Sequence, residues 1–230
     1  MNISVIGSGS SGNCYRVSDG QTSLLLEAGL PIKRIKAACD YDLSGISACL
    51  VTHEHSDHIK AANDLMKAGV DVYMTEGTAD AGKILTYRLK LWSRHGKEYC
   101  TERIGTFIVK PFLVHHDAAE PVGYLIESPV TGEKLLFCTD TYYIDYKFSG
   151  LTHIMCEANY SAETLDESDP RRSRLLRSHM SLENCIGLLA ANDLSKIKEI
   201  WLIHLSSSNG DAEEFKRRIQ ETTGSVVYIA

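Results

Sequence analysis

The sequence predicts one α/β domain, and three observations support this prediction. Apolar runs of strand length alternate along the chain with segments of helical pattern. Hydrophobic residues make up 43% of the 230 residues and charged residues 23%, a balance typical of a globular protein with a buried core. The sequence shows no linker, no low-complexity tract and no repeat. We therefore expect residues 1–230 to form a single domain.

The first half of the chain is expected to start with a strand and a hairpin and then to alternate strands with helices. Residues 18–20 (Ser-Asp-Gly) are typical of the turn of a hairpin. Pro31 fits the first turn of a helix. The predicted strands lie at residues 3–6, 15–17, 23–26, 48–51 and 70–74, and the predicted helices at residues 31–38, 59–66 and 75–85.

The second half is expected to contain further strands and two helices. Ser181 is a favourable N-cap for a helix at residues 182–192, whose apolar residues recur at helical spacing. Asp211 and Glu214 resemble a capping box, which opens a last helix that ends at Gln220. The predicted strands lie at residues 106–114, 122–127, 134–138, 152–156, 199–203 and 226–229.

Charge and cysteine content limit the classes of function. The net charge of −6 does not suggest a dedicated tight binder of nucleic acid. It does not exclude a nucleic-acid enzyme, in which basic residues are local and metal ions supply positive charge. No apolar stretch approaches the length of a membrane span, and the N-terminus lacks the pattern of a signal peptide. The seven scattered cysteines favour reduced thiols in a cytoplasmic protein, and the sequence identifies no protein partner.

The most informative segment is His53-Glu54-His55-Ser56-Asp57-His58, with the pattern H-x-H-x-D-H. On an extended segment His53 and His55 point the same way, and Asp57 and His58 at the start of a helix can turn toward a neighbouring position. Neutral imidazole and carboxylate groups are the usual ligands of Zn²⁺ and related ions. The alternative is a polar turn between a strand and a helix, but such a turn seldom uses three histidines within six residues.

Three further predicted strands end in residues of the same type. The strands lead to His115 and His116, to Asp140, and to His204. Ligands at the same end of neighbouring strands can converge on one edge of a sheet sandwich, where rigid elements hold them. The alternative for His204 by itself is a hydrogen-bonded histidine of the core.

The number of these residues suits two divalent metal ions, each with an open position for water or substrate. Periodicity does not choose between the two neighbouring histidines of the first site. Histidine-rich sites suit Zn²⁺, while Mn²⁺ also serves phosphoryl chemistry. We expect two ligand sets and one bridging carboxylate: His53, His55 and either His115 or His116; Asp57, His58 and His204; and Asp140 between them.

Other segments have two interpretations each. Residues 7–13, rich in glycine and serine, form either a flexible loop or a loop whose N–H groups and hydroxyls face an anionic group. The basic and aromatic residues of 87–97 form either a solvated face or a surface that faces the substrate. The same two alternatives apply to the arginines of 171–177.

The H-x-H-x-D-H pattern, followed at a distance by His, Asp and His, resembles the metallo-β-lactamase-fold superfamily over essentially the whole chain. Finer features resemble the YycJ/WalJ group of small single-domain members, which are cytoplasmic 5′-to-3′ DNA exonucleases. These features are Ser10-Ser11-Gly12-Asn13, His116-Asp117-Ala118-Ala119-Glu120-Pro121-Val122-Gly123-Tyr124, Glu157-Ala158-Asn159-Tyr160, His179-Met180-Ser181 and His204-Leu205-Ser206-Ser207-Ser208-Asn209.

The resemblance implies an αββα sandwich. It assigns the third histidine of the first site to His116 and the bridge to Asp140, and it implies that His179 lies near the leaving group. The superfamily usually has Asp after its early strand, where it supports the metal ligands. Here Glu27 stands in that place, and its extra methylene changes the reach of the carboxylate.

Together these observations predict a dinuclear metal-dependent phosphodiesterase, more specifically a DNA exonuclease, in which a metal-activated water attacks phosphorus. Asp57 or Asp140 is expected to orient the water. His179 is expected to give a proton to the departing oxygen, with a surface histidine beside a helix N-cap as the alternative. Residues expected to hold a terminal phosphate are Ser11, Asn13, Ser206, Ser208 and Asn209.

Three other functions stay open at this stage. The first is an esterase, thioesterase or lactonase on the same metal centre, which would need a pocket rather than a groove. The second is a phosphodiesterase for a small nucleotide. The third is a metal-binding scaffold without catalysis, which would not need an open dinuclear site.

Overall fold

In the computed structural model, the described residues are 1–161, 163, 165, 172–206 and 211–230. They form two compact units. Unit 1 comprises Met1–Leu113 and Ala118–Gly132, and unit 2 comprises Val114–Asp117 and Glu133–Ala230. The expectation of a single domain stays a prediction. Within the described part of the chain, no helix has both the length and the apolar character needed to cross a membrane.

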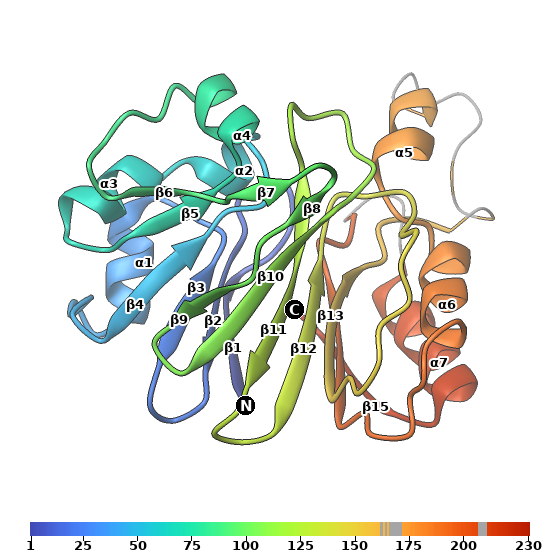
Figure 1. Cartoon of the computed structure of the whole chain (residues 1–230). Helices are drawn as coiled ribbons and strands as arrows, with labels where there is room; N and C mark the ends of the chain where they lie inside the picture. Colours follow the sequence, from blue (N-terminus) through green and yellow to red (C-terminus); the bar gives the residue numbers. More distant parts are fainter. Residues whose placement is uncertain (162, 164, 166–171, 207–210) are drawn as a thin grey trace. The chain divides into compact units, whose positions relative to one another are not determined.

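Unit 1 contains a six-stranded sheet whose strands follow the order of the sequence (Figure 1). Its first three strands pair antiparallel, and the following ones pair in parallel. A short hairpin and three further antiparallel strands complete the strands of this unit. The strands are β1 (Asn2–Gly7), β2 (Cys14–Ser18), β3 (Ser23–Leu26), β4 (Ile46–Leu50), β5 (Val72–Met74), β6 (Leu89–Leu91), β7 (Arg94–His95), β8 (Glu98–Tyr99), β9 (Glu102–Ile104), β10 (Phe107–Leu113) and β11 (Val122–Ser128).

Short helices pack on the six-stranded sheet of unit 1 through a shared apolar core (Figure 1). Leu25 of β3 and Cys49 of β4 are fully buried in this core together with Ile35 and Leu65 from two of the helices. Because the core holds both sheet and helices, the loops that follow β3 and β4 leave from a rigid base. The helices are α1 (Ile32–Ala38), α2 (Ser56–Ile59), α3 (Ala62–Lys67) and α4 (Glu76–Ala81).

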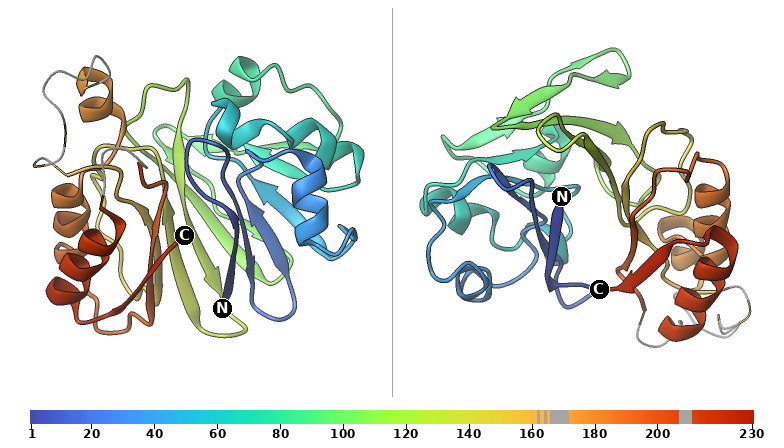
Figure 2. Two further views of the ribbon diagram at one scale, coloured as in Figure 1. Left: turned by 180° about the vertical axis from the view of Figure 1, so that it is seen from behind. Right: turned by 90° about the horizontal axis from the view of Figure 1, so that it is seen from below.

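Unit 2 contains a run of parallel strands in the order β15-β14-β13-β12. Two of its helices, α6 and α7, lie side by side along this sheet (Figure 2). They bury Leu182 and Cys185 of α6 and Phe215 and Ile219 of α7. The elements are β12 (Glu133–Cys138), β13 (His153–Glu157), α5 (Arg172–Ser178), α6 (Leu182–Ala190), β14 (Glu199–Ile203), α7 (Ala212–Thr223) and β15 (Val226–Ile229).

Several predicted elements are confirmed residue for residue. The strands expected at 23–26, 199–203 and 226–229 are β3, β14 and β15. The N-caps predicted for the last two helices are also confirmed. The side chain of Ser181 accepts the N–H of Asn184 at 3.1 Å, and that of Asp211 accepts the N–H of Glu214 at 3.1 Å.

The helix expected at residues 59–66 is wrong, because this region is divided between α2 and α3. The segment after β3 interrupts the helical hydrogen bonds. The N–H of Ala28 donates to the carbonyl of His58, and the N–H of Ala61 donates to the carbonyl of Ala28, each at 2.8 Å. Asp57 and His58 therefore lie in a separate short helix, tied by backbone bonds to the end of β3.

Other boundaries also differ from the expectation. The helix expected to reach residue 85 ends at Ala81, and the chain turns at Lys83, whose φ of 53° is left-handed. The short strands β7, β8 and β9 were not predicted, because two or three residues carry little periodicity. The arginine cluster near residue 174 was not expected to be helical, yet its described residues form α5.

Asp19 joins three turns of unit 1. In the turn between β2 and β3, its carboxylate accepts the N–H groups of Gln21 at 3.0 Å and Thr22 at 2.9 Å. It also accepts the hydroxyl of Thr106 before β10 at 2.6 Å and that of Ser128 at the end of β11 at 2.7 Å. Burial acts to raise the pKa of Asp19, but these hydrogen bonds outweigh burial and lower that pKa to about 2.

We expect Asp19→Ala to lower the free energy of unfolding by about 2 kcal/mol near neutral pH, because the donors lose a charged acceptor. The folded pKa of Asp19 lies below the ordinary value of about 3.9. Its contribution is therefore complete above about pH 4 and is lost as the pH falls toward about 2. Urea denaturation of both proteins across this range measures the difference.

The control is Asp193→Ala, since Asp193 is exposed and accepts the N–H of Ser195 at 3.0 Å within one surface turn. We expect this control to change stability little at any pH. A stability difference between the wild type and Asp19→Ala that stays constant from neutral to acidic pH would contradict the assigned hydrogen-bond network.

Candidate metal centre

In unit 1, the first two histidines of the motif direct their rings at each other. His53 follows β4, and His55 is the N-cap residue of α2. Nε2 of His53 lies 3.0 Å from Nδ1 of His55, and Nδ1 of His53 lies 2.9 Å from the hydroxyl of Thr52. The two facing nitrogens suit a shared metal ion, because their lone pairs point at one place.

The second pair of the motif lies in α2. His58 is fully buried, and its Nε2 is 3.3 Å from Oδ2 of Asp57. On the other side of the ring, Nδ1 of His58 is 3.6 Å from Oε1 of Glu27. At this distance the Glu27 carboxylate forms no hydrogen bond with the ring, but its charge favours the hydrogen on Nδ1. This would leave Nε2 beside Asp57 as the candidate ligand atom.

Glu27 thus occupies the supporting place that the sequence analysis assigned to it. The residue follows β3 with a left-handed φ of 67°, and its N–H donates to the carbonyl of Leu50 at 2.8 Å. Its Oε2 accepts the N–H of Thr52 at 3.3 Å. The side chain is completely buried, and its extra methylene allows one carboxylate to reach both the β4 end and His58.

Asn13 supports the motif through its backbone and its side chain. Its N–H donates to the carbonyl of Asp57 at 2.8 Å, and its Nδ2 lies 3.3 Å from Nε2 of His58. Its Oδ1 accepts the N–H of Gly9 at 2.8 Å. Asn13 is 1% exposed, and the contacts given above are all with other residues of the protein. Its expected contact with a phosphate stays a prediction.

Gly29 permits a very close approach between the end of β3 and the motif. A Cβ placed on Gly29 would lie 1.6 Å from the carbonyl oxygen of Asp57. The same glycine donates its N–H to the carbonyl of Asn13 at 2.9 Å. Only glycine fits at this position, because any side chain would displace the backbone that carries Asp57 and His58.

In unit 2, three acidic or histidine residues meet at one edge of the parallel sheet. Cys138 of β12 pairs with Cys156 of β13, and Glu157 of β13 pairs with Ile203 of β14. Asp140 and His204 therefore follow the strands on either side of β13, at the same carboxyl end that Glu157 occupies. Their φ angles, 49° for Asp140 and 54° for His204, are left-handed, which is the kind of strain that concentrates at functional sites.

Glu157 contacts most of the other residues at this edge, and no role was predicted for it from the sequence. Its Oε1 accepts Nδ1–H from His179 at 2.7 Å and from His204 at 3.0 Å. Its Oε2 accepts the N–H of Met180 at 3.0 Å and that of Thr141 at 3.3 Å. One signal could have indicated it, namely an acidic residue directly after a fully apolar strand segment.

The side chain of His179 lies against Glu157 and His204. Its ring stacks on that of His204 with a centroid distance of 5.5 Å. Burial acts to lower the pKa of His179, but the charge of Glu157 and the hydrogen bond to it outweigh burial and raise that pKa. The pKa of Glu157 is lowered in turn, because His179 outweighs the opposite effect of burial.

The two neighbouring histidines, 115 and 116, face different surroundings. Nδ1–H of His116 donates to the carbonyl of Ser178 at 2.7 Å, and its Nε2 lies 3.8 Å from Oδ2 of Asp140. Burial lowers the pKa of His116, which favours the neutral form that binds metals. His115 instead pairs with Asp145 at 2.5 Å. These positions support His116 as the ligand.

The remaining predicted substrate residues lie in loops. Ser11 is exposed in the turn after β1, and the N–H of Ser206 donates to the carbonyl of Asn159 at 3.2 Å. Ser208, Asn209, Arg171 and most of the acidic stretch 161–169 lie outside the described residues. In the basic segment 87–97, Arg88 pairs with Asp71 at 2.8 Å and Arg94 with Glu120 at 2.9 Å, which favours a structural surface there.

The side chains present in each unit fit divalent ions. Four residues of unit 2, Asp140, Glu157, His179 and His204, have potential ligand atoms within 4.8 Å of one another, and Asp140 and His204 are the two that the sequence predicts as ligands. In unit 1 the four candidate ligand residues of the motif form two pairs, and a buried carboxylate lies behind one of them. Imidazoles with assigned tautomers and buried carboxylates are the donors that Zn²⁺ and Mn²⁺ use.

We expect Gly29→Ala to abolish high-affinity metal binding, because the added methyl group overlaps the carbonyl of Asp57 and displaces α2. Metal content after dialysis against Zn²⁺, measured by mass spectrometry, gives the answer. The matched control is Gly45→Ala, where no atom lies within 4 Å of the new Cβ. A Gly29→Ala protein that is folded and retains the metal content of the control would show that this close approach is not required.

Comparison with known proteins identifies the family to which the chain belongs. Residues 30–205 match the family model of the β-lactamase superfamily domain. The chain is 32% identical over 231 residues to the exodeoxyribonuclease YycJ of Bacillus anthracis, covering 93% of this chain and 85% of that protein. It is 31% identical over 229 residues to the exodeoxyribonuclease WalJ of Streptococcus pneumoniae serotype 2 (strain D39 / NCTC 7466), covering 91% and 83%.

A solved structure agrees in fold. The crystal structure of the metallo-β-lactamase fold protein YhfI from Bacillus subtilis matches with a TM-score of 0.77 at 18% identity, covering 99% of this chain and 95% of that chain. The fold class expected from the sequence is thereby confirmed. The chain therefore belongs to the metallo-β-lactamase-fold superfamily and, within it, to the family of YycJ and WalJ.

Proposed function

We propose that this protein is a two-metal phosphodiesterase that degrades DNA from an end, in the 5′-to-3′ direction. The observation that carries this proposal is the set of histidines and carboxylates at strand ends in both units, where a buried carboxylate or carbonyl lies behind His58, His116 and His204. The names of its relatives YycJ and WalJ, both exodeoxyribonucleases, support DNA as the substrate.

In this proposal seven ligand residues hold two divalent ions, Zn²⁺ or Mn²⁺. The number of donors supports two ions, since three ligands per ion leave an open position. The first ion takes two histidines of unit 1 and one of unit 2, and the second takes the α2 pair and the histidine after β14. The proposed sets are His53, His55 and His116; Asp57, His58 and His204; and Asp140 as the bridge.

When bound, two such ions would supply Lewis acidity toward phosphoryl oxygens and a water that is nucleophilic at neutral pH. Asp57 and Asp140 are the carboxylates that would orient this water. His179 would hold the proton for the leaving oxygen on Nε2, because its Nδ1–H donates to Glu157 at 2.7 Å. The raised pKa of His179 keeps its imidazole protonated to a higher pH, as a general acid needs.

Substrate contacts and location complete the proposal. We place Ser11, Asn13, Ser206, Ser208 and Asn209 near the terminal phosphate, as the sequence predicts. A cytoplasmic location is supported by the cysteines, since all seven are free thiols.

Degradation of 5′-phosphorylated linear DNA tests this function. We expect the purified protein to shorten such DNA with Mn²⁺ or Zn²⁺, and to stop when a chelator removes the metal. Asp140→Ala is expected to lower the rate by about 10³-fold or more, because the proposed bridging carboxylate is lost.

The outcome that contradicts the proposal is equally plain. A protein that carries two metal ions per chain but leaves all linear DNA intact is not an exonuclease. Small phosphodiesters and thioesters, tested in the same preparation, would then identify the class of bond that it cleaves.

A further inference from the structure

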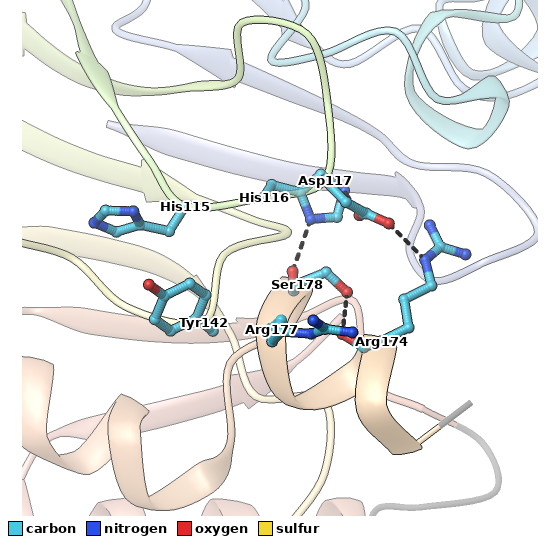
Figure 3. A pocket seen from close by; sticks show the side chains of 7 residues that line it. All are labelled: His115, His116, Asp117, Tyr142, Arg174, Arg177 and Ser178. Atoms are coloured by element: carbon cyan, nitrogen blue, oxygen red, sulfur yellow. Dashed lines mark hydrogen bonds and ion pairs between the residues drawn. The ribbon is translucent and has the colours of Figure 1, made fainter. Parts of the chain in front are cut away.

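A pocket of about 380 Å³ lies in unit 2 beside His116 (Figure 3). Its volume falls within the range of about 300–1,000 Å³ that is usual for ligand sites. One wall is aromatic, with His115 and Tyr142, and the other is basic, with Arg174 and Arg177 of α5. Except for His116, none of the residues that line it belongs to the proposed metal ligands.

The aromatic wall is a rigid platform. The rings of His115 and Tyr142 have centroids 5.2 Å apart and planes tilted by 34°. Backbone bonds hold the two residues together, since the N–H of Tyr142 donates to the carbonyl of His115 at 3.2 Å and the N–H of His115 donates to Thr141 Oγ1 at 3.0 Å. Asp145 fixes the ring of His115 from the other side at 2.5 Å.

The basic wall is fastened to the same segment. Nε of Arg174 donates to Oδ2 of Asp117 at 2.7 Å, and the carbonyl of Ser178 accepts Nδ1–H of His116 at 2.7 Å. Arg177 lies one turn further along α5, and its Nε donates to the carbonyl of Ser173 at 2.9 Å. Figure 3 shows its guanidinium group across the pocket from Tyr142. Aromatic rings opposite guanidinium groups are the usual partners of a base and its phosphate.

Two residues that line the pocket are close in the sequence to proposed metal ligands. Tyr142 is two residues after Asp140, and His115 directly precedes His116. A nucleotide held there would therefore sit next to the proposed metal ligands of unit 2. A solvated basic face would explain the arginines alone, but not an aromatic platform with 36% of Tyr142 exposed across from them.

We propose that this pocket binds one unpaired nucleotide of single-stranded DNA, with its base on Tyr142 and His115 and its phosphate on Arg177. The inference rests on the proposed DNA exonuclease function. A base inside a duplex is stacked and paired on both sides, so it reaches such a platform only after unpairing.

The test measures DNA binding without catalysis. Fluorescence anisotropy in the presence of a chelator gives the affinity of the metal-free protein for a short, 5′-phosphorylated, single-stranded DNA. Tyr142→Ala is expected to weaken binding roughly 10-fold or more, which is the usual effect of losing one stacked base. Tyr142→Phe keeps the ring and is expected to bind within about twofold of the wild type.

Tyr146→Ala is the matched control, because Tyr146 is 40% exposed in the same loop but does not line this pocket. We expect this variant to bind DNA as the wild type does. A second series uses DNA in which one nucleotide at a time lacks its base. At one position, loss of the base is expected to weaken binding of the DNA to the wild type by the same factor as Tyr142→Ala does. Loss of that base is expected to cause no further weakening when the DNA binds the Tyr142→Ala protein.

The outcomes separate this inference from the proposed function. If the protein with metal degrades DNA but Tyr142→Ala binds as the wild type does, the nucleotide pocket is wrong and the exonuclease stands. The same holds if the base-lacking DNA and Tyr142→Ala act additively, or if the metal-free wild type binds no DNA. If the metal-loaded wild type degrades no DNA at all, the result contradicts the proposed exonuclease function. It then also contradicts the nucleotide pocket, which rests on that function.

Discussion

One buried carboxylate oxygen, Oε1 of Glu157, positions two histidine side chains of the candidate metal centre in unit 2. It accepts Nδ1–H from His179 and from His204, so both imidazoles are turned and their tautomers are assigned at once. A buried carboxylate is expensive unless it is paired and hydrogen-bonded, and this one is satisfied by two imidazoles and two backbone N–H groups. Glu27 has the corresponding place behind His58 in unit 1.

Three residues of the candidate centre also share an unusual backbone conformation. Glu27, Asp140 and His204 each follow a buried strand, and each has a left-handed φ between 49° and 67°. Residues other than glycine adopt this conformation only where the surroundings impose it. The strands provide the rigid base, and the strained residue after each strand turns its side chain out of the sheet toward the functional edge.

The sequence predicted those parts in which chemistry and local pattern agree. The H-x-H-x-D-H motif, the carboxyl-end residues Asp140 and His204, and the capped helices were visible because each depends on neighbours along the chain. The division of the helix after His58 was not, since it results from Ala28 bonding to residues 58 and 61. Nor was the role of Glu157, whose two histidine partners lie 22 and 47 residues away in the sequence.

The central claim is that the chain binds two divalent ions through the two proposed ligand sets. Native mass spectrometry of the Zn²⁺- or Mn²⁺-loaded protein tests it most directly, with His55→Ala and His58→Ala beside the wild type. The account predicts two ions per chain in the wild type and one in each variant, because each histidine belongs to a different ligand set. A wild type with fewer than two ions, or variants that both retain two, would contradict it.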